Sequence, residues 1–510
     1  MKKLAFLLLI TGGVWFSAKA QTESFGLAEE ALLFSATNPT YSARITAIGG
    51  AITALGGDIS SISTNPAGLG FYRRSEVSLS TRLQFSNVNS LYFGTSVSEN
   101  DNNFNVPNVS VVINTSVDEI HPGKWRGGSF GFSYNRINNF NSESRVFTEE
   151  VPESIIQSFL DQANGVPFFE LEGTTDDITS LTEAAFFTFL ITPRSFIDSV
   201  GGSDSEYFTD VFGSPFQEEI TRTSGSQNQW NFSYGGNFDD RFYFGFNLSI
   251  LTINYQRERF FQEFGYRDPD DLVILNDLNS IETLELDGSG VNATLGLIYR
   301  LNDYVRLGLS YTTPSTININ REFGFDLEAN YDDFLFETLE ESVVLSSEFV
   351  ESPLFETEYN LRTPSRLNLG TSVFLGKNGF ISIDAEYIDY AGANIDSDEF
   401  IADGDNQIID EVFSSTWNYR AGIEYRYGKI RLRGGYNFQG DPTNDGFNQE
   451  RQTISAGIGA RFNQFYGDLF YSNTQFDSQR TLYPLLESPD PTANIDTRIQ
   501  QVGLTFGYLF

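Results

Sequence analysis

The 510-residue chain contains no cysteine, one methionine and one histidine, His121. Without cysteine no disulfide can hold the chain together. A single histidine leaves any serine nucleophile one possible imidazole base, and nothing in the spacing pairs the two, so we expect no enzyme and no catalytic residue. The usual axial ligands of haem are nearly absent as well. We therefore expect no cofactor and no metal site, and Asp403-Gly404-Asp405 is interpreted as solvated charge because it lacks the spacing of a calcium loop.

Basic residues are scarce, with 32 Lys and Arg against 68 Asp and Glu and a net charge of −36. This balance argues against nucleic acid as a partner. Long apolar runs are also scarce, since Leu4–Ile10 is too short to span a bilayer. That run follows two lysines and precedes Ala18-Lys19-Ala20, the pattern of an export signal over residues 1–20 that is removed before Gln21. No run of about twenty apolar residues follows it, so no transmembrane helix is expected.

Aromatic residues and glycine are abundant. The chain has 48 Phe, 24 Tyr and 45 Gly, yet its mean hydropathy is −0.25. Many aromatic residues at a low mean hydropathy are typical of strands that alternate apolar and polar residues, as in membrane barrels. A soluble array of β-sandwiches is the alternative, and the spacing of the strands has to distinguish the two.

The alternation is clear in Phe242–Ile250, where Phe242, Phe244, Phe246 and Leu248 share one face and polar residues or glycine share the other. A period of two indicates a strand. Fourteen such segments can be laid out. They lie near 76–93, 105–114, 127–140, 224–238, 241–257, 285–300, 304–321, 357–376, 379–392, 416–427, 429–440, 450–462, 464–474 and 497–510.

Connections between these segments alternate between short and long. Short ones such as Gly428-Lys429 and Asn463-Gln464 alternate with long ones near 141–223, 258–284 and 322–356, among others. Tight turns at one rim and long loops at the other are typical of a transmembrane barrel. The sequence therefore predicts an all-β fold, a closed antiparallel barrel of about 14 strands over 73–510 in the outer membrane, in contact with its lipids. The terminal Phe510 resembles the signal read by barrel assembly machinery.

Residues 21–72 do not follow the barrel pattern. Ile45, Ile48, Ile52 and Leu55 have helical spacing, which predicts a short helix ending at Gly56-Gly57. The segment is too small to be stable alone, and a barrel of this size has an interior that must be filled or left as a pore. We expect it to fold inside the lumen as a plug.

The stretch Gly49–Asp58, followed by Asn65-Pro66-Ala67-Gly68-Leu69, resembles the N-terminal hatch of the long-chain fatty acid transporter (FadL/TodX) family. Similar stretches follow in family order at Arg306–Tyr311, Thr363–Gly370, Arg420–Tyr425 and Leu432–Tyr436. The resemblance implies a fourteen-strand barrel that carries hydrophobic small molecules, by default long-chain fatty acids, through an apolar lumen pocket. It also implies release through the wall near the third strand and a hatch or gate role for Asn65, Pro66 and Ala67. A plain turn is the alternative at this Asn-Pro pair.

Two other functions remain open at this stage: a diffusion pore for polar solutes, and a structural or adhesive surface barrel. Gly127, Gly128 and Gly131 could weaken strand pairing where the family's exit would lie. They could equally be ordinary barrel glycines.

Ligand-binding candidates come from two regions. In the loop near 141–223, two segments of helical spacing carry Phe159 and Leu160 and then Phe187 and Phe189, and they would form an apolar landing site or pack on each other to close the loop. Within the barrel, Arg420, Arg431 and Arg433 occupy the polar faces of two strands. They would bind a carboxylate or pair with other luminal charges.

Overall fold

The computed structural model describes residues 26–36, 40–115, 123–172, 178–197, 203–267, 273–339 and 342–510. The expected export signal and His121 lie outside these ranges. Within them, no helix combines the length and the apolar character needed to cross a membrane.

The described chain forms one closed antiparallel barrel of fourteen strands, because β1 pairs with both β2 and β21. Several of the fourteen are interrupted and carry two or three labels each. In order, the strands are β1 (Glu76–Tyr92), β2 (Thr95–Asn114), β3 (Trp125–Asn139) with β4 (Ser142–Thr148), β7 (Ser214–Phe238), β8 (Phe242–Arg267), β9 (Leu275–Arg300), β10 (Val305–Thr312) with β11 (Thr316–Glu337), β12 (Ser342–Glu351) with β13 (Phe355–Arg362) and β14 (Arg366–Phe374), β15 (Gly379–Asp389) with β16 (Asn394–Asp396), β17 (Ser415–Tyr427), β18 (Ile430–Gln439), β19 (Arg451–Phe462), β20 (Phe465–Thr481) and β21 (Thr492–Leu509). The predicted barrel and its strand number are confirmed.

The strands are longer than the alternation predicted, and two of the expected long loops are wrong. Most of 258–284 belongs to β8 and β9, and most of 322–356 belongs to β11 and β12. Outside the bilayer the outer face of a strand no longer has to be apolar, so the sequence signal fades while the hydrogen-bonded ladder continues. The pairs Arg222–Glu258 and Arg259–Glu282 link neighbouring strands there.

The apolar face changes sides along several strands. In β8 the exposed face carries Phe244, Phe246, Leu248 and Ile250, whereas farther on it is Leu251, Ile253 and Tyr255 that are buried in the interior. The exposed residues of the apolar half form the lipid-facing belt. Beyond the belt the apolar side chains face inward and line a chamber within the barrel.

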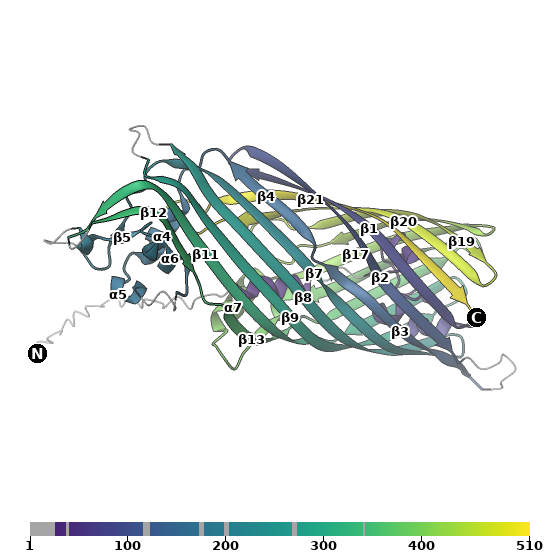
Figure 1. Ribbon diagram of the computed structural model, residues 1–510. Coiled ribbons are helices and arrows are strands. Elements are labelled where there is room, and N and C mark those ends of the chain that lie inside the picture. The colour runs from purple at the N-terminus through teal and green to yellow at the C-terminus, as the bar shows by residue number, and fades with distance from the viewer. Residues whose placement is uncertain are drawn as a thin grey trace, which may run out of the picture.

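The helices of the long loop cluster at the end of the barrel opposite the C-terminus (Figure 1). They are α4 (Ile155–Ala163), α5 (Phe168–Leu171) and α6 (Leu181–Phe187), joined by the 3-10 turn η2 (Arg194–Phe196) and the short ladder of β5 (Thr192–Pro193) with β6 (Tyr207–Phe208). The two helices expected in this loop are thus present. On the same side, η3 (Tyr390–Gly392) and α7 (Asp403–Val412) follow β15.

The N-terminal segment lies inside the barrel, as its contacts with strands all round the wall show. Its elements are α1 (Leu27–Ser35), α2 (Ala43–Thr46), α3 (Ser61–Thr64) and the 3-10 helix η1 (Pro66–Phe71). We call residues 40–72 the plug. The helix expected over Ile45–Leu55 is wrong in extent, because α2 ends at Thr46 and Gly49 and Gly50 adopt left-handed backbone angles, φ 70° and 84°.

Candidate functional site

The plug rests on a belt of glycines that face the lumen. Cross-strand pairs join Gly235 with Gly245, Gly308 with Gly370, and Gly422 with Gly435. A methyl group added at any glycine of this belt would lie within 2.7 Å of a plug atom. Its members are Gly235, Gly245, Gly296, Gly308, Gly370, Gly422 and Gly435. The wall lacks side chains at these positions, and plug atoms, most of them backbone, fill the space.

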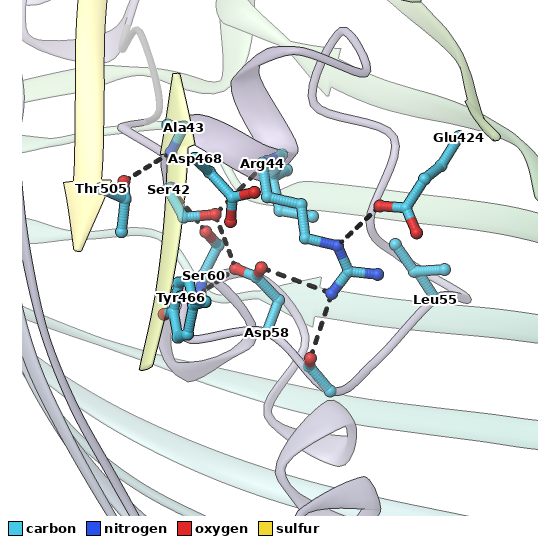
Figure 2. A network of polar contacts seen from close by, with 12 residues as sticks. Ser42, Ala43, Arg44, Leu55, Asp58, Ser60, Glu424, Tyr466, Asp468 and Thr505 are labelled. Atoms are coloured by element: carbon cyan, nitrogen blue, oxygen red, sulfur yellow. Dashed lines mark hydrogen bonds and ion pairs between the residues drawn. The ribbon is translucent and has the colours of Figure 1, made fainter. Parts of the chain in front are cut away.

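Buried polar contacts tie the plug to itself and to the wall (Figure 2). Arg44 lies 3.2 Å from a carboxylate oxygen of Glu424 and 3.6 Å from Asp58. Asp58 also accepts hydrogen bonds from the Ser42 hydroxyl and the Ser60 amide, at 2.9 and 3.0 Å. Since breaking a buried ion pair leaves an uncompensated charge, this network holds the plug in one position.

Asn65 joins the plug to the strand backbone. Its side-chain amide donates to the carbonyl oxygens of Thr53 at 2.7 Å and of Leu297 and Leu309 at 3.3 Å, and its oxygen accepts from the Ala67 amide. The side chain therefore caps η1, and Pro66 occupies the first turn of that helix, a position where proline is tolerated. Asn65 therefore holds the plug to the wall in addition to forming a turn. The gate role of Asn65, Pro66 and Ala67 stays a prediction.

The apolar chamber beyond the lipid-facing belt is filled by α1. Leu27, Ala28, Ala31 and Phe34 are buried against the inward-facing residues of five barrel strands. Those wall residues include Leu251, Ile253, Leu284, Leu286, Ile317, Ile319, Leu361 and Ile388. The helix thus occupies the part of the lumen that is best suited to an apolar ligand.

Two buried carboxylates position α1. Asp405 of α7 accepts hydrogen bonds from the Leu27 and Ala28 amides, at 3.0 and 3.3 Å, which satisfies free donors at the helix N-terminus. The interpretation of this acidic stretch as solvated charge is wrong for Asp405, which is buried. Glu30 pairs with Arg321 at 3.1 Å and accepts a hydrogen bond from Tyr359. Burial raises the pKa of Glu30 although Arg321 opposes the shift.

We expect Glu30→Ala to release α1 from the chamber, because the substitution leaves Arg321 buried without its carboxylate, a loss of about 3–5 kcal/mol. Glu29→Ala is the matched control, since Glu29 is the neighbouring residue of the same helix turn and is exposed. Hydrogen exchange of residues 27–36 in the purified barrel measures the release. Equal protection in the two variants would contradict this role for Glu30.

A small cavity of about 110 Å³ separates α1 from the plug. Phe34 and Ile52 contribute to it, but most of its lining consists of Ser, Thr, Asn and Gln with Arg366, Glu386 and Arg420. The cavity is far below the 300–1,000 Å³ typical of small-molecule sites. An apolar ligand that needs a cavity of typical volume can therefore bind in this part of the lumen only if α1 moves.

The three predicted arginines lie in two settings. Arg420 pairs with Glu386, and Arg433 lies 2.8 Å from Glu424 and 2.7 Å from Asp468, so both take part in luminal charge pairing. Arg431 faces a different cavity, below the plug. A carboxylate-binding role for the three together has no common site, and for each of them it stays a prediction.

The predicted aromatic residues of the long loop lie mainly within its own core. Phe159 is buried, while Leu160, Phe187 and Phe189 are partly buried around the same cluster. Phe189 makes an edge contact with Phe336 of β11, with ring centroids 5.4 Å apart. The packing is that of a closed loop, the alternative that the sequence left open, and the landing site remains untested.

The wall has a weak seam between β2 and β3. Their ladder runs only from Asn108 to Asn114, whereas the ladder of β2 with β1 extends to Thr95. Pro107, just before the ladder begins, has no amide hydrogen to donate. On the lipid side the paired part of the seam borders an apolar groove of about 380 Å³, and on the inner side a methyl group added at Gly131 would meet Ile62 of the plug. Gly127 lies at a register shift between β3 and β7.

The lipid-facing belt, the closed sheet and the filled lumen define an outer-membrane β-barrel with an internal plug. No protein-family model and no curated protein matches the sequence. Solved structures do match. A FadL homologue from Pseudomonas aeruginosa superposes with a TM-score of 0.52 at 11% identity, over 92% of this chain and 99% of the other. The toluene transporter TodX of P. putida gives 0.50 at 12% identity, over 92% and 99%.

The chain therefore has the fold of FadL- and TodX-type transporters. The resemblance inferred from the hatch motif is confirmed at the level of the fold. The sequence did not reveal the luminal chamber, although one signal was present: the adjacent apolar pair Ile250-Leu251 marks the point where the alternation of β8 changes phase.

Proposed function

We propose that this barrel takes up hydrophobic small molecules across the outer membrane, and that long-chain fatty acids are among them. The observation that carries the proposal is the apolar luminal chamber occupied by α1. Apolar side chains that face the inside of a barrel do not contact lipid, so contact with the membrane does not explain them. A diffusion pore for polar solutes would have a polar interior.

In this proposal α1 holds the place of the ligand. A hydrophobic molecule that enters from the loop end displaces α1 and gains the same apolar contacts, worth about 25 cal/mol per Å² of buried apolar surface. The plug then has to shift before release. The seam between β2 and β3 supports sideways release, because its ladder is short and an apolar groove lies on the lipid side. The names of the structural neighbours, a FadL homologue and a toluene transporter, agree with this substrate class.

Uptake in cells tests the proposal. Labelled oleate, toluene and a sugar are supplied to cells that lack the gene and to cells to which it has been restored. We expect oleate or toluene uptake to fall on deletion and to return on restoration, with sugar uptake unchanged. A change in sugar uptake alone would make the barrel a diffusion pore, and no change in any of the three would favour a surface-binding role.

A further inference from the structure

A second, larger cavity lies below the plug, at the end of the barrel that carries the tight turns. Its volume is about 810 Å³, and plug residues Leu55–Gly57 and Gly70–Tyr72 line it together with Arg73 and the ends of the strands. Eight arginines face this cavity but only two carboxylates, Asp240 and Glu424. A chain with twice as many acidic as basic residues thus places eight of its 32 basic residues in one cavity.

The two carboxylates are already engaged. Glu424 lies within 3.2 Å of Arg44, Arg426 and Arg433, and Asp240 lies 3.5 Å from Arg126. Neither can neutralise the remaining guanidinium groups. The cavity therefore carries an excess of positive charge that its own residues do not balance.

Three of the arginines have no carboxylate within ion-pair distance in the described part of the chain: Arg306, Arg431 and Arg461. Arg306 donates to the Leu55 carbonyl oxygen at 2.6 Å, and Arg431 donates to that of Lys429 at 3.1 Å. Arg461 lies over the Tyr466 ring, and its Nε atom is buried without a hydrogen-bond partner. These contacts orient the three groups, and none of them is a contact with a carboxylate.

Strand register brings like charges together here. Arg431 of β18 lies directly opposite Arg426 of β17, and like charges at facing positions destabilise a sheet. Arg461 follows on β19, where its backbone amide donates to the Lys429 carbonyl oxygen. An anion bound between these side chains would reverse the cost, because arginine binds carboxylate and phosphate oxygens through paired hydrogen bonds.

Aromatic residues form another part of the lining. The rings of Phe71 and Tyr243 stack with centroids 3.8 Å apart. The guanidinium carbon of Arg306 lies 4.2 Å from the centroids of Phe71 and Phe374. The cavity thus offers apolar surface beside its arginines, which suits a ligand with an apolar body and a charged end.

We propose that this cavity is a binding site for organic anions, in which Arg306, Arg431 and Arg461 hold the anionic oxygens and the aromatic residues contact the apolar body. The site deepens the proposed function and rests on it, since it gives the charged end of an anionic amphiphilic cargo a binding site below the plug. Neutral hydrophobic molecules would gain nothing from the arginines.

Titration calorimetry on the purified full-length barrel in lipid nanodiscs tests this site. Octanoate and octan-1-ol serve as probes of the same chain length that differ in charge, and inorganic phosphate serves as an anion without an apolar body. The variant is Arg431→Gln with Arg461→Gln. The matched control is Arg145→Gln with Arg222→Gln, which removes the same charge from partly exposed arginines of the opposite half of the barrel.

We expect octanoate to bind the wild-type barrel and to bind the Arg431→Gln, Arg461→Gln variant at least about tenfold more weakly, because charge-assisted hydrogen bonds are lost. The control pair should keep the wild-type affinity, and octan-1-ol should bind all forms weakly. If the glutamine variant does not fold, Arg431→Lys with Arg461→Lys replaces it and should retain octanoate binding while losing part of the affinity.

Three results would overturn the proposal. The first is equal octanoate affinity in the wild type and in the variant of Arg431 and Arg461, whether glutamine or lysine. The others are octan-1-ol binding as tight as octanoate, and binding of phosphate alone. Uptake of neutral toluene separates this failure from that of the proposed function. If toluene uptake depends on the gene while octanoate does not bind, only the anion site is wrong; if no hydrophobic compound is taken up, the transport function is wrong.

Discussion

Gly435→Val is expected to open the lumen and produce steady ionic currents across a planar bilayer, where the wild-type barrel stays closed. A side chain at Gly435 would overlap the backbone of Ile48 and Gly49. The valine side chain and the plug backbone cannot occupy the same space, so either the strand or the plug has to move. The hydrogen-bonded wall is more rigid than the plug, which has little regular structure. The plug is therefore the part that moves.

The neighbouring residue provides a matched control. A side chain at Gly434, on the outer face of the same strand, would meet only Ile423 at 3.8 Å, so Gly434→Val should leave the barrel closed. Valine is also well suited to strands, so both variants should form the barrel. Silence of Gly435→Val, or equal currents from both variants, would show that the glycine belt does not seat the plug.

Glu424→Ala is expected to lower the free energy of unfolding by about 3–5 kcal/mol, the cost of leaving buried charges without their partner. The carboxylate of Glu424 is fully buried and lies within 3.2 Å of Arg44 on the plug and of Arg426 and Arg433 on the wall. Its removal also weakens the link between plug and barrel. Urea unfolding of the barrel in lipid vesicles measures the change.

The control removes a carboxylate from an exposed pair. Glu258 lies 3.3 Å from Arg222, and both side chains are about half exposed. Exposed ion pairs contribute about 0–1 kcal/mol, so Glu258→Ala should have little effect. Equal losses in the two variants would mean that Glu424 does not organise the buried network.

The barrel was predictable because the bilayer imposes a strict pattern on its strands. Phe242 to Ile250 alternate since one face meets lipid and the other meets the lumen. The same pattern could not show how far β9 and β11 continue, because beyond the lipid the outer face accepts polar residues and the apolar residues change to the inner face. For this reason the expected loops at 258–284 and 322–356 proved to be largely strand.

The site was less predictable. The hatch motif identified the segment around Asn65, but spacing along the chain carries no information about which wall residues it meets. Helical spacing was misleading at Ile45–Leu55, because those side chains are buried around an irregular backbone rather than along a helix. Arg420 and Arg433 were found as luminal residues, whereas their partners Glu386 and Asp468 lie on other strands.

The sequence by itself determined the transmembrane barrel, the number of its strands and the presence of a segment that does not belong to the wall. These follow from short-range periodicity, which the membrane enforces locally. Only the tertiary structure decided that α1 fills the apolar chamber, that glycines seat the plug and that eight arginines meet below it. Each of these arrangements joins residues hundreds of positions apart, and closure of the barrel is what brings them within contact distance.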